Sequence, residues 1–161
     1  MRTSIAAIIA LAAAASAISP ASAVQSPAAV AAHAPDQAVT AFLEAFDTLD
    51  SDRFNAFFAD DATMFFPNGP FPQARVEGKA AVTAAFGRLF DMARQRGITR
   101  LSLRPLDIQV QDHGAFAVAT FHLRGNGNIG RRSIILRRDG TAWRIVHFHA
   151  SSLEEQPASD D

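Results

Sequence analysis

The sequence of 161 residues contains no cysteine, no tyrosine and only one tryptophan. Without cysteine the fold has no disulfide bonds, thiolate metal sites or thiol nucleophile, so hydrophobic packing must supply its stability. Phenylalanine, with 13 copies, is the main aromatic residue. The chain also lacks a charge excess, because 15 basic and 16 acidic residues leave a net charge of -1. This balance argues against nucleic-acid binding, and we expect no nucleic-acid partner.

The first apolar run is too short for a membrane anchor. It covers Ile5–Ala17, follows the positive charge of Arg2 and precedes the small residues Ala21–Ala23. This pattern is typical of a cleaved signal peptide. The alternative is a membrane-spanning helix, but such a helix needs about 20 apolar residues and this run is shorter. We therefore expect 1–23 to be a signal peptide, or a cut after Ala17, and the mature protein to be periplasmic or secreted with no membrane attachment.

The mature chain is long enough for one domain with a sizeable core. Residues 24–35 are rich in alanine and show no periodicity, which predicts a flexible linker. Residues 36–152 form the predicted domain. Residues 153–161 are acidic and are predicted to be a disordered tail.

Apolar residues at helical spacing predict three helices. The first begins at Asp36, its expected N-cap, and extends to Leu49. A short second helix is expected around Phe54–Phe58. The third covers about Gly78–Arg96, with Gly97 as the left-handed residue that ends it.

The strand predictions follow from a change of period. One strand is expected at Thr63–Phe66 and another near Arg75. Beyond the third helix, apolar residues recur at every second position, which is typical of strands. Turn residues separate four such segments, which predict an antiparallel meander: Leu106–Val110, Ala115–Arg124, Ile129–Arg138 and Ala142–Ser151. Pro105 is expected at a sheet edge or a bulge, because proline cannot donate to a strand ladder. The predicted class is α+β, with a curved antiparallel sheet packed against three helices.

Three stretches carry a resemblance to a known superfamily. They are Phe57–Pro67 (FFADDATMFFP), Arg75–Phe90 (RVEGKAAVTAAFGRLF) and Arg137–Ser152 (RRDGTAWRIVHFHASS). They resemble the SnoaL-like and ketosteroid-isomerase-like proteins of the nuclear transport factor 2-like superfamily. The last stretch is similar to the end of the calcium/calmodulin-dependent protein kinase II association domain. The resemblance implies a cone, in which a bent sheet wraps around three helices and leaves an apolar pocket between them. The convex outer face of such a sheet often serves for dimerisation.

The resemblance also implies where an isomerase would keep its catalytic groups. A ketosteroid isomerase uses a general-base carboxylate, a tyrosine and a protonated carboxylic acid. In this chain Phe66 stands at the position of the base, Phe42 at the tyrosine and Ile134 at the second acid. None of these three side chains can transfer a proton, so ketosteroid isomerisation is not expected, and no catalytic residue is assigned with certainty.

His122 is the candidate polar group of the predicted pocket. It shares one strand face with Val118 and Thr120, and the resembling position in the kinase association domain is an arginine that binds small carboxylates. The other two such arginines correspond to Ser133 and Ala150. A histidine there could bond a ligand or relay a proton, whereas a core histidine bonded to a backbone carbonyl is the alternative. The predicted pocket lining is Phe42, Met64, Phe66, Phe86, Val118, Thr120, His122 and Ser133.

His147 and His149 lie two residues apart on one predicted strand and should point the same way. Such a pair suggests a metal site, but the spacing supplies no third protein ligand for zinc. We expect no metal and no cofactor, and leave open whether His147 or Phe148 faces the pocket.

Three functions remain open from the sequence. The leading hypothesis is an exported domain that binds a small, mostly apolar ligand in the cone pocket and forms homodimers. The second is an isomerase, cyclase or dehydratase that uses His122 as acid or base. The third is a self-association module without a ligand.

Overall fold

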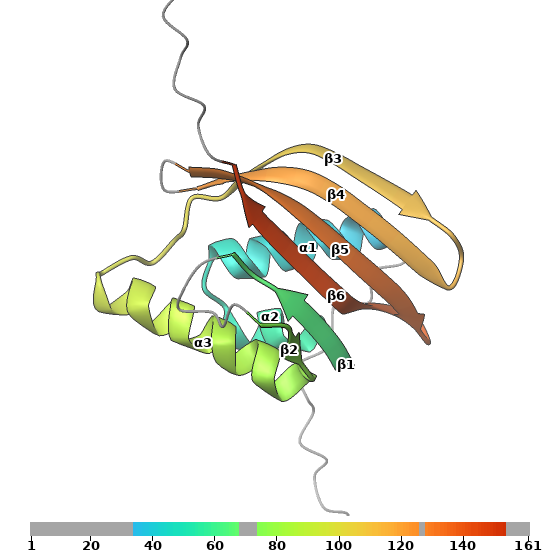
Figure 1. Cartoon of the computed structure of the whole chain (residues 1–161), viewed down its shortest axis with the longest axis horizontal. Helices are drawn as coiled ribbons and strands as arrows, with labels where there is room; N and C mark the ends of the chain where they lie inside the picture. Colours follow the sequence, from blue (N-terminus) through green and yellow to red (C-terminus); the bar gives the residue numbers. More distant parts are fainter. Residues whose placement is uncertain (1–33, 68–73, 126–127, 154–161) are drawn as a thin grey trace, which may run out of the picture.

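The computed structural model describes residues 34–67, 74–125 and 128–153. The predicted signal peptide, most of the predicted linker and nearly all of the predicted acidic tail lie outside these residues. The described part contains three helices and six strands (Figure 1): α1 Pro35–Asp47, α2 Ser51–Ala56, β1 Phe58–Phe65, β2 Val76–Glu77, α3 Lys79–Gln95, β3 Arg104–Asp112, β4 Phe116–Gly125, β5 Asn128–Asp139 and β6 Ala142–Ser152. None of the helices in these ranges is long and apolar enough to span a membrane.

The N-terminal ends of the first two helices are set by different residues. Helix α1 begins at Pro35 with Ala34 as its N-cap, so the prediction that Asp36 is the N-cap is wrong. Proline suits the first helical position because the lost N–H has no partner there, and Asp36 instead places its negative charge in the first turn. Helix α2 has a side-chain cap, since Asp50 Oδ1 accepts from Arg53 N at 3.1 Å.

Helix α3 ends as the sequence predicts. Gly97 has φ = 72°, a left-handed conformation that costs glycine little. Arg94 lies in the last turn, where a positive charge offsets the negative end of the helix. Its guanidinium donates to the backbone oxygen of Leu49 at 2.7 Å, which ties the end of α3 to the turn between α1 and α2.

The six strands form one mixed sheet in the order β2-β1-β6-β5-β4-β3. The predicted meander is confirmed, since β3 to β6 pair consecutively and antiparallel. Strand β3 is an edge strand, which is where Pro105 is tolerated. The sheet is not wholly antiparallel, because β1 pairs with β6 in parallel. The parallel pair arises because the chain leaves β1, forms β2 and α3, and returns to β1 only with its last strand (Figure 1).

Strand β1 is longer than predicted. It covers Phe58–Phe65, so Phe58 belongs to the sheet and not to the second helix. Asp60 and Asp61 lie within the strand. The pairing of β1 with β6 shifts register between Phe58 and Thr63, and the two exposed aspartates fall in that irregular part.

The helices cover one face of the curved sheet. Helix α3 packs on β1, and α1 contacts β3 and β4 (Figure 1). The strands alternate between buried and exposed residues, as a sheet with one covered face should. We call the helix-covered side the inner face and the opposite side the outer face.

Candidate functional site

Three of the predicted pocket residues lie in the solid core. Phe42 on α1, Met64 on β1 and Phe86 on α3 belong to the core and are only 1%, 0% and 0% exposed. The ring of Phe42 lies 4.9 to 6.3 Å from five other phenyl rings, those of Phe46, Phe54, Phe57, Phe58 and Phe148. Ile134, the position of the missing second acid, is also fully buried. Phenylalanine rings therefore fill the deep part of the cone.

Four other predicted pocket residues lie on the outer face. The inner face of β4 carries Ala119 and its odd-numbered neighbours, which are buried. Val118, Thr120 and His122 alternate with them, and Ser133 is the cross-strand partner of Thr120. Successive residues of a strand point to opposite faces, so these four side chains cannot line the cone interior. The prediction of a pocket around His122 fails for this reason.

His122 instead borders an open groove of about 380 Å³ on the outer face. Asp107 from β3 and Arg131 from β5 line the same groove. Asp107 has φ = 55° at the point where the pairing of β3 and β4 shifts register. Most of the side chains that line the groove are polar, and the groove is open to solvent, which does not suit an apolar ligand.

A bulge decides which residues of β6 face inward. The pairing of β5 and β6 shifts between Ile135 and Leu136, and this shift reverses the alternation along β6. Ile145 and Phe148 are both buried, whereas His147 is only partly buried. Phe148, and not His147, therefore faces the cone interior.

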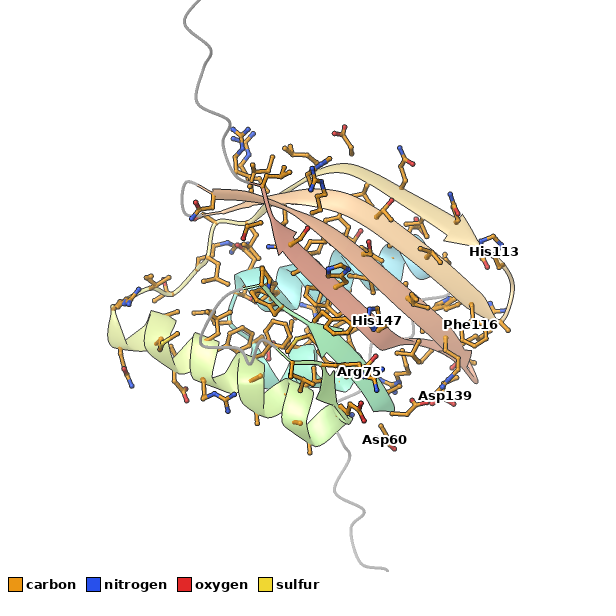
Figure 2. The ribbon with its side chains drawn as sticks, viewed as in Figure 1. Asp60, Arg75, His113, Phe116, Asp139 and His147 are labelled. Atoms are coloured by element: carbon orange, nitrogen blue, oxygen red, sulfur yellow. The ribbon has the colours of Figure 1, made fainter. Side chains whose placement is uncertain are left out.

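His147 and His149 share the outer face, as their spacing predicts. The ring of Phe65 lies 5.9 Å from His147 and 6.1 Å from His149. Thr63 Oγ1 lies 2.8 Å from His147 Nδ1. Partial burial lowers the pKa of His147 from its ordinary value of 6.5, and the charges of His149 and Arg75 lower it further (Figure 2).

Metal binding finds no support in the described residues, which contain no group of three or more histidine, aspartate or glutamate side chains able to hold an ion. Asp61, one of the two aspartates of β1, forms a bidentate pair with Arg137 at 2.8 and 2.9 Å. The hydrogen bonds from Arg137 lower the pKa of the Asp61 carboxyl. The pair is solvent-exposed and contributes little to stability.

A cavity on the inner face is lined by residues of the α3–β3 connection, of β4 and β5 next to their turn, and of the end of β6. Its volume is about 290 Å³. Phe66 is the one predicted pocket residue that lines it. Nine of the fourteen described lining residues have apolar side chains, although polar atoms make up nearly half of the lining surface: Phe46, Phe66, Pro67, Leu89, Leu101, Leu103, Leu123, Gly125, Asn128, Ile129, Gly130, Arg132, Ser152 and Leu153. We call this space the cone-mouth cavity.

Arg132 is the only ionisable side chain among the described lining residues. Its Nη1 donates to the backbone oxygens of Arg131 at 2.8 Å and Ser151 at 3.3 Å. Its guanidinium carbon lies 5.8 Å from the centre of the Phe66 ring. The Nε atom is completely buried and has no hydrogen-bond partner in the described part of the chain. Burial lowers the pKa of Arg132, although the side chain stays charged.

Neighbouring small residues make room for this guanidinium. A Cβ atom at Gly130 would lie 2.6 Å from Arg132 Nη1 and 2.5 Å from Ser151 O, closer than such atoms approach. Ala150, the cross-strand partner of Arg132 on β6, is also small. The position of Arg132 therefore depends on glycine at 130.

The period-two pattern of β5 is a sequence signal that places Arg132 on the inner face. Ile134 and Leu136 are the buried apolar residues of β5, and Arg132 continues their alternation toward the turn. Arg131 points outward, so the two adjacent arginines lie on opposite faces of the sheet.

The pattern of the SnoaL-like domain matches residues 36–155. This chain belongs to the SnoaL-like domain family. No curated protein matches the chain. The family accounts for the curved sheet on three helices, and the predicted superfamily is confirmed.

Solved structures show the same fold for this SnoaL-like domain. An NTF2-like protein of unknown function from Pseudomonas putida has a TM-score of 0.62 at 20% identity, covering 76% of this chain and 92% of its own. A candidate dehydratase of the NTF2-like family from Streptomyces avermitilis gives 0.60 at 17% identity, with 74% and 94% covered. A candidate calcium/calmodulin-dependent protein kinase type II association domain from Thiobacillus denitrificans gives 0.58 at 25% identity, with 74% and 95% covered. These likenesses are compatible with ligand-binding and isomerase-type domains, and the fold does not choose between them.

Proposed function

We propose that this SnoaL-like domain is a binding protein that holds one small, mostly apolar molecule in the cone-mouth cavity. The observation that carries the proposal is the cavity itself, about 290 Å³ of space walled chiefly by leucine and phenylalanine. Its volume is near the lower end of the range for small-molecule sites, so a one-ring compound or a medium-length acyl chain fits and a larger ligand would protrude. The apolar walls favour the ligand through burial of its hydrocarbon surface.

The chemistry of the lining favours binding over proton transfer. General acid–base catalysis needs a group that gains and loses a proton near the working pH. Among the described lining residues only Arg132 is ionisable, and arginine stays protonated. His122 gives no support to the alternative enzyme, because it lies on the outer face.

The test is to fill the cavity. Leu103 lines it, whereas Ile108 is 41% exposed on the edge strand β3. We expect Leu103→Trp to abolish the ligand-induced rise in melting temperature across a panel of small aromatic and aliphatic compounds. Ile108→Trp is the matched control and should respond like the unmodified protein. Equal responses in the two variants, or no response in the unmodified protein to any compound, would contradict binding in this cavity.

We further propose that the outer face mediates homodimerisation, and that the protein is exported to the periplasm or secreted. Dimerisation is supported by Phe65, which is 40% exposed beside the two histidines of β6. Export is supported by the signal-peptide pattern of residues 1–23. Light scattering should report a dimer for the mature chain and a monomer for Phe65→Asp, with Ile108→Asp remaining dimeric. A monomeric unmodified protein at micromolar concentration would contradict the interface.

A further inference from the structure

The cone-mouth cavity combines mostly apolar side chains with one half-buried cation, Arg132, that has no counter-charge among the described residues. Each of the salt bridges in the described residues joins other pairs, and Arg132 takes part in none of them. Its contacts are two backbone oxygens and the face of the Phe66 ring. Taking a guanidinium out of water costs free energy that a neutral carbonyl oxygen only partly offsets. A fold normally pairs such a charge or leaves it in solvent.

We propose that Arg132 is the anchor for a negatively charged group of the ligand, so that the ligand is a small amphiphilic carboxylate. This inference rests on the proposed function, since it names the class of molecule that the cone-mouth cavity would hold. The planar fork of arginine matches the two oxygens of a carboxylate. An arene or acyl chain attached to that carboxylate would occupy the space beside the leucines.

The lining argues for one charge and not for several. A phosphate ester or a dicarboxylate brings a second negative charge, and the described lining offers no second cation. An uncharged ligand would leave the guanidinium with only backbone oxygens as its described acceptors and with no counter-charge. A single carboxylate satisfies the guanidinium and leaves the rest of the molecule to apolar contacts.

The geometry around Arg132 is also costly to maintain without a ligand. Gly130 is required for the guanidinium to lie against Ser151, as a side chain at that position would collide with both. Glycine within a strand weakens it, because glycine loses more backbone freedom on folding and packs no side chain. The chain thus holds an unpaired cation in place at a cost to its own stability, which is expected of a binding group.

The experiment compares acids with their amides on three proteins. Benzoate and octanoate, with benzamide and octanamide as uncharged matches, are titrated by calorimetry into the unmodified mature protein, Arg132→Met and Arg131→Met. Arg131 is the matched control, because it is the adjacent arginine of the same strand and is exposed on the outer face. We expect Arg132→Met to weaken binding of the acids by about 10- to 100-fold, the usual range for losing a hydrogen bond to a charged group. Arg131→Met should leave it unchanged, and Arg132→Met should bind acids and amides alike.

A second readout separates binding from a structural role. If Arg132 serves a ligand, Arg132→Met without ligand should unfold at the same temperature as the unmodified protein or higher, because a half-buried charge without a counter-charge has been removed. If Arg132 is structural, the same variant should unfold earlier. If the methionine variant fails to fold, Arg132→Lys and Gly130→Ala replace it in the test. Both should weaken acid binding, because the first removes the planar guanidinium and the second displaces it.

The outcomes distinguish the proposed role of Arg132 from the proposed binding function of the cavity. Acids and amides binding equally to the unmodified protein and to Arg132→Met would overturn the role of Arg132 while leaving the cavity as a binding site. Binding of none of the four compounds, together with no effect of Leu103→Trp on any ligand response, would overturn both.

Discussion

Replacing Phe42 by alanine tests whether the ring-filled interior is core or ligand space. Phe42 is 1% exposed and its ring contacts five other phenyl rings. Truncating a buried phenylalanine costs about 3 to 5 kcal/mol, because transfer free energy is lost and a cavity is left behind. A domain of this size has a free energy of unfolding of about 5 to 15 kcal/mol, so the variant should be marginal.

The control is a phenylalanine that buries little of its side chain. Phe116 is 45% exposed at the end of the sheet where the β3–β4 hairpin turns, near His113 and Asp139 (Figure 2). Phe116→Ala should change stability by no more than about 0.5 kcal/mol.

Equilibrium unfolding in urea measures both variants. With a slope of about 2 kcal/mol per molar urea, Phe42→Ala should lower the midpoint by about 2 M at an unchanged slope. A cost for Phe42→Ala below about 1 kcal/mol would refute the assignment of Phe42 to a packed core. It would instead indicate that this ring borders open space, as the sequence had suggested.

Two further predictions concern the polar groups around the sheet. His147 has a lowered pKa in the folded state, so the unfolded chain takes up its proton first. Stability, measured as the urea midpoint, should therefore fall as pH drops below 6.5, and His147→Asn should flatten that fall. Asp47 is 8% exposed and accepts a hydrogen bond from Leu103 N at 2.7 Å. Asp47→Ala should lower the free energy of unfolding by about 1.5 to 3 kcal/mol. It should also weaken ligand binding, because Leu103 lines the cavity. The exposed Asp91 gives the comparison, since Asp91→Ala should cost less than about 1 kcal/mol in the same unfolding assay. A flat pH profile in the unmodified protein, or equal costs for the two aspartates, would contradict these assignments.

Local sequence signals predicted most of the secondary structure. The helix over Gly78–Arg96 and its end at Gly97 depend on residues within a few positions of one another, and so does the meander. Such signals need no knowledge of distant contacts. The extent of β1 was misjudged because Phe58, Asp60 and Asp61 show no clean alternation, and only the neighbouring β6 holds them in the sheet.

The candidate site was less accessible to such reasoning. That Val118, Thr120 and His122 share a face followed from the period of two, but which face the helices cover did not. A shift of one residue exchanges inside and outside, and so the sequence pointed to His122 where the structure points to Arg132. The two residues lie on neighbouring strands, on opposite sides of the same sheet.

The sequence by itself determined the class of this protein, the order of its elements and its family, because each depends on periodicity, turn residues or short motifs. The tertiary structure alone decided what is hollow and what is solid. The bulge between β5 and β6 turns Phe148 inward, and the phenylalanines of the helices then meet it and fill the deep cone. Among the described residues, the inner-face cavity lies at the mouth. Its place depends on side chains that are far apart in the chain and meet on folding.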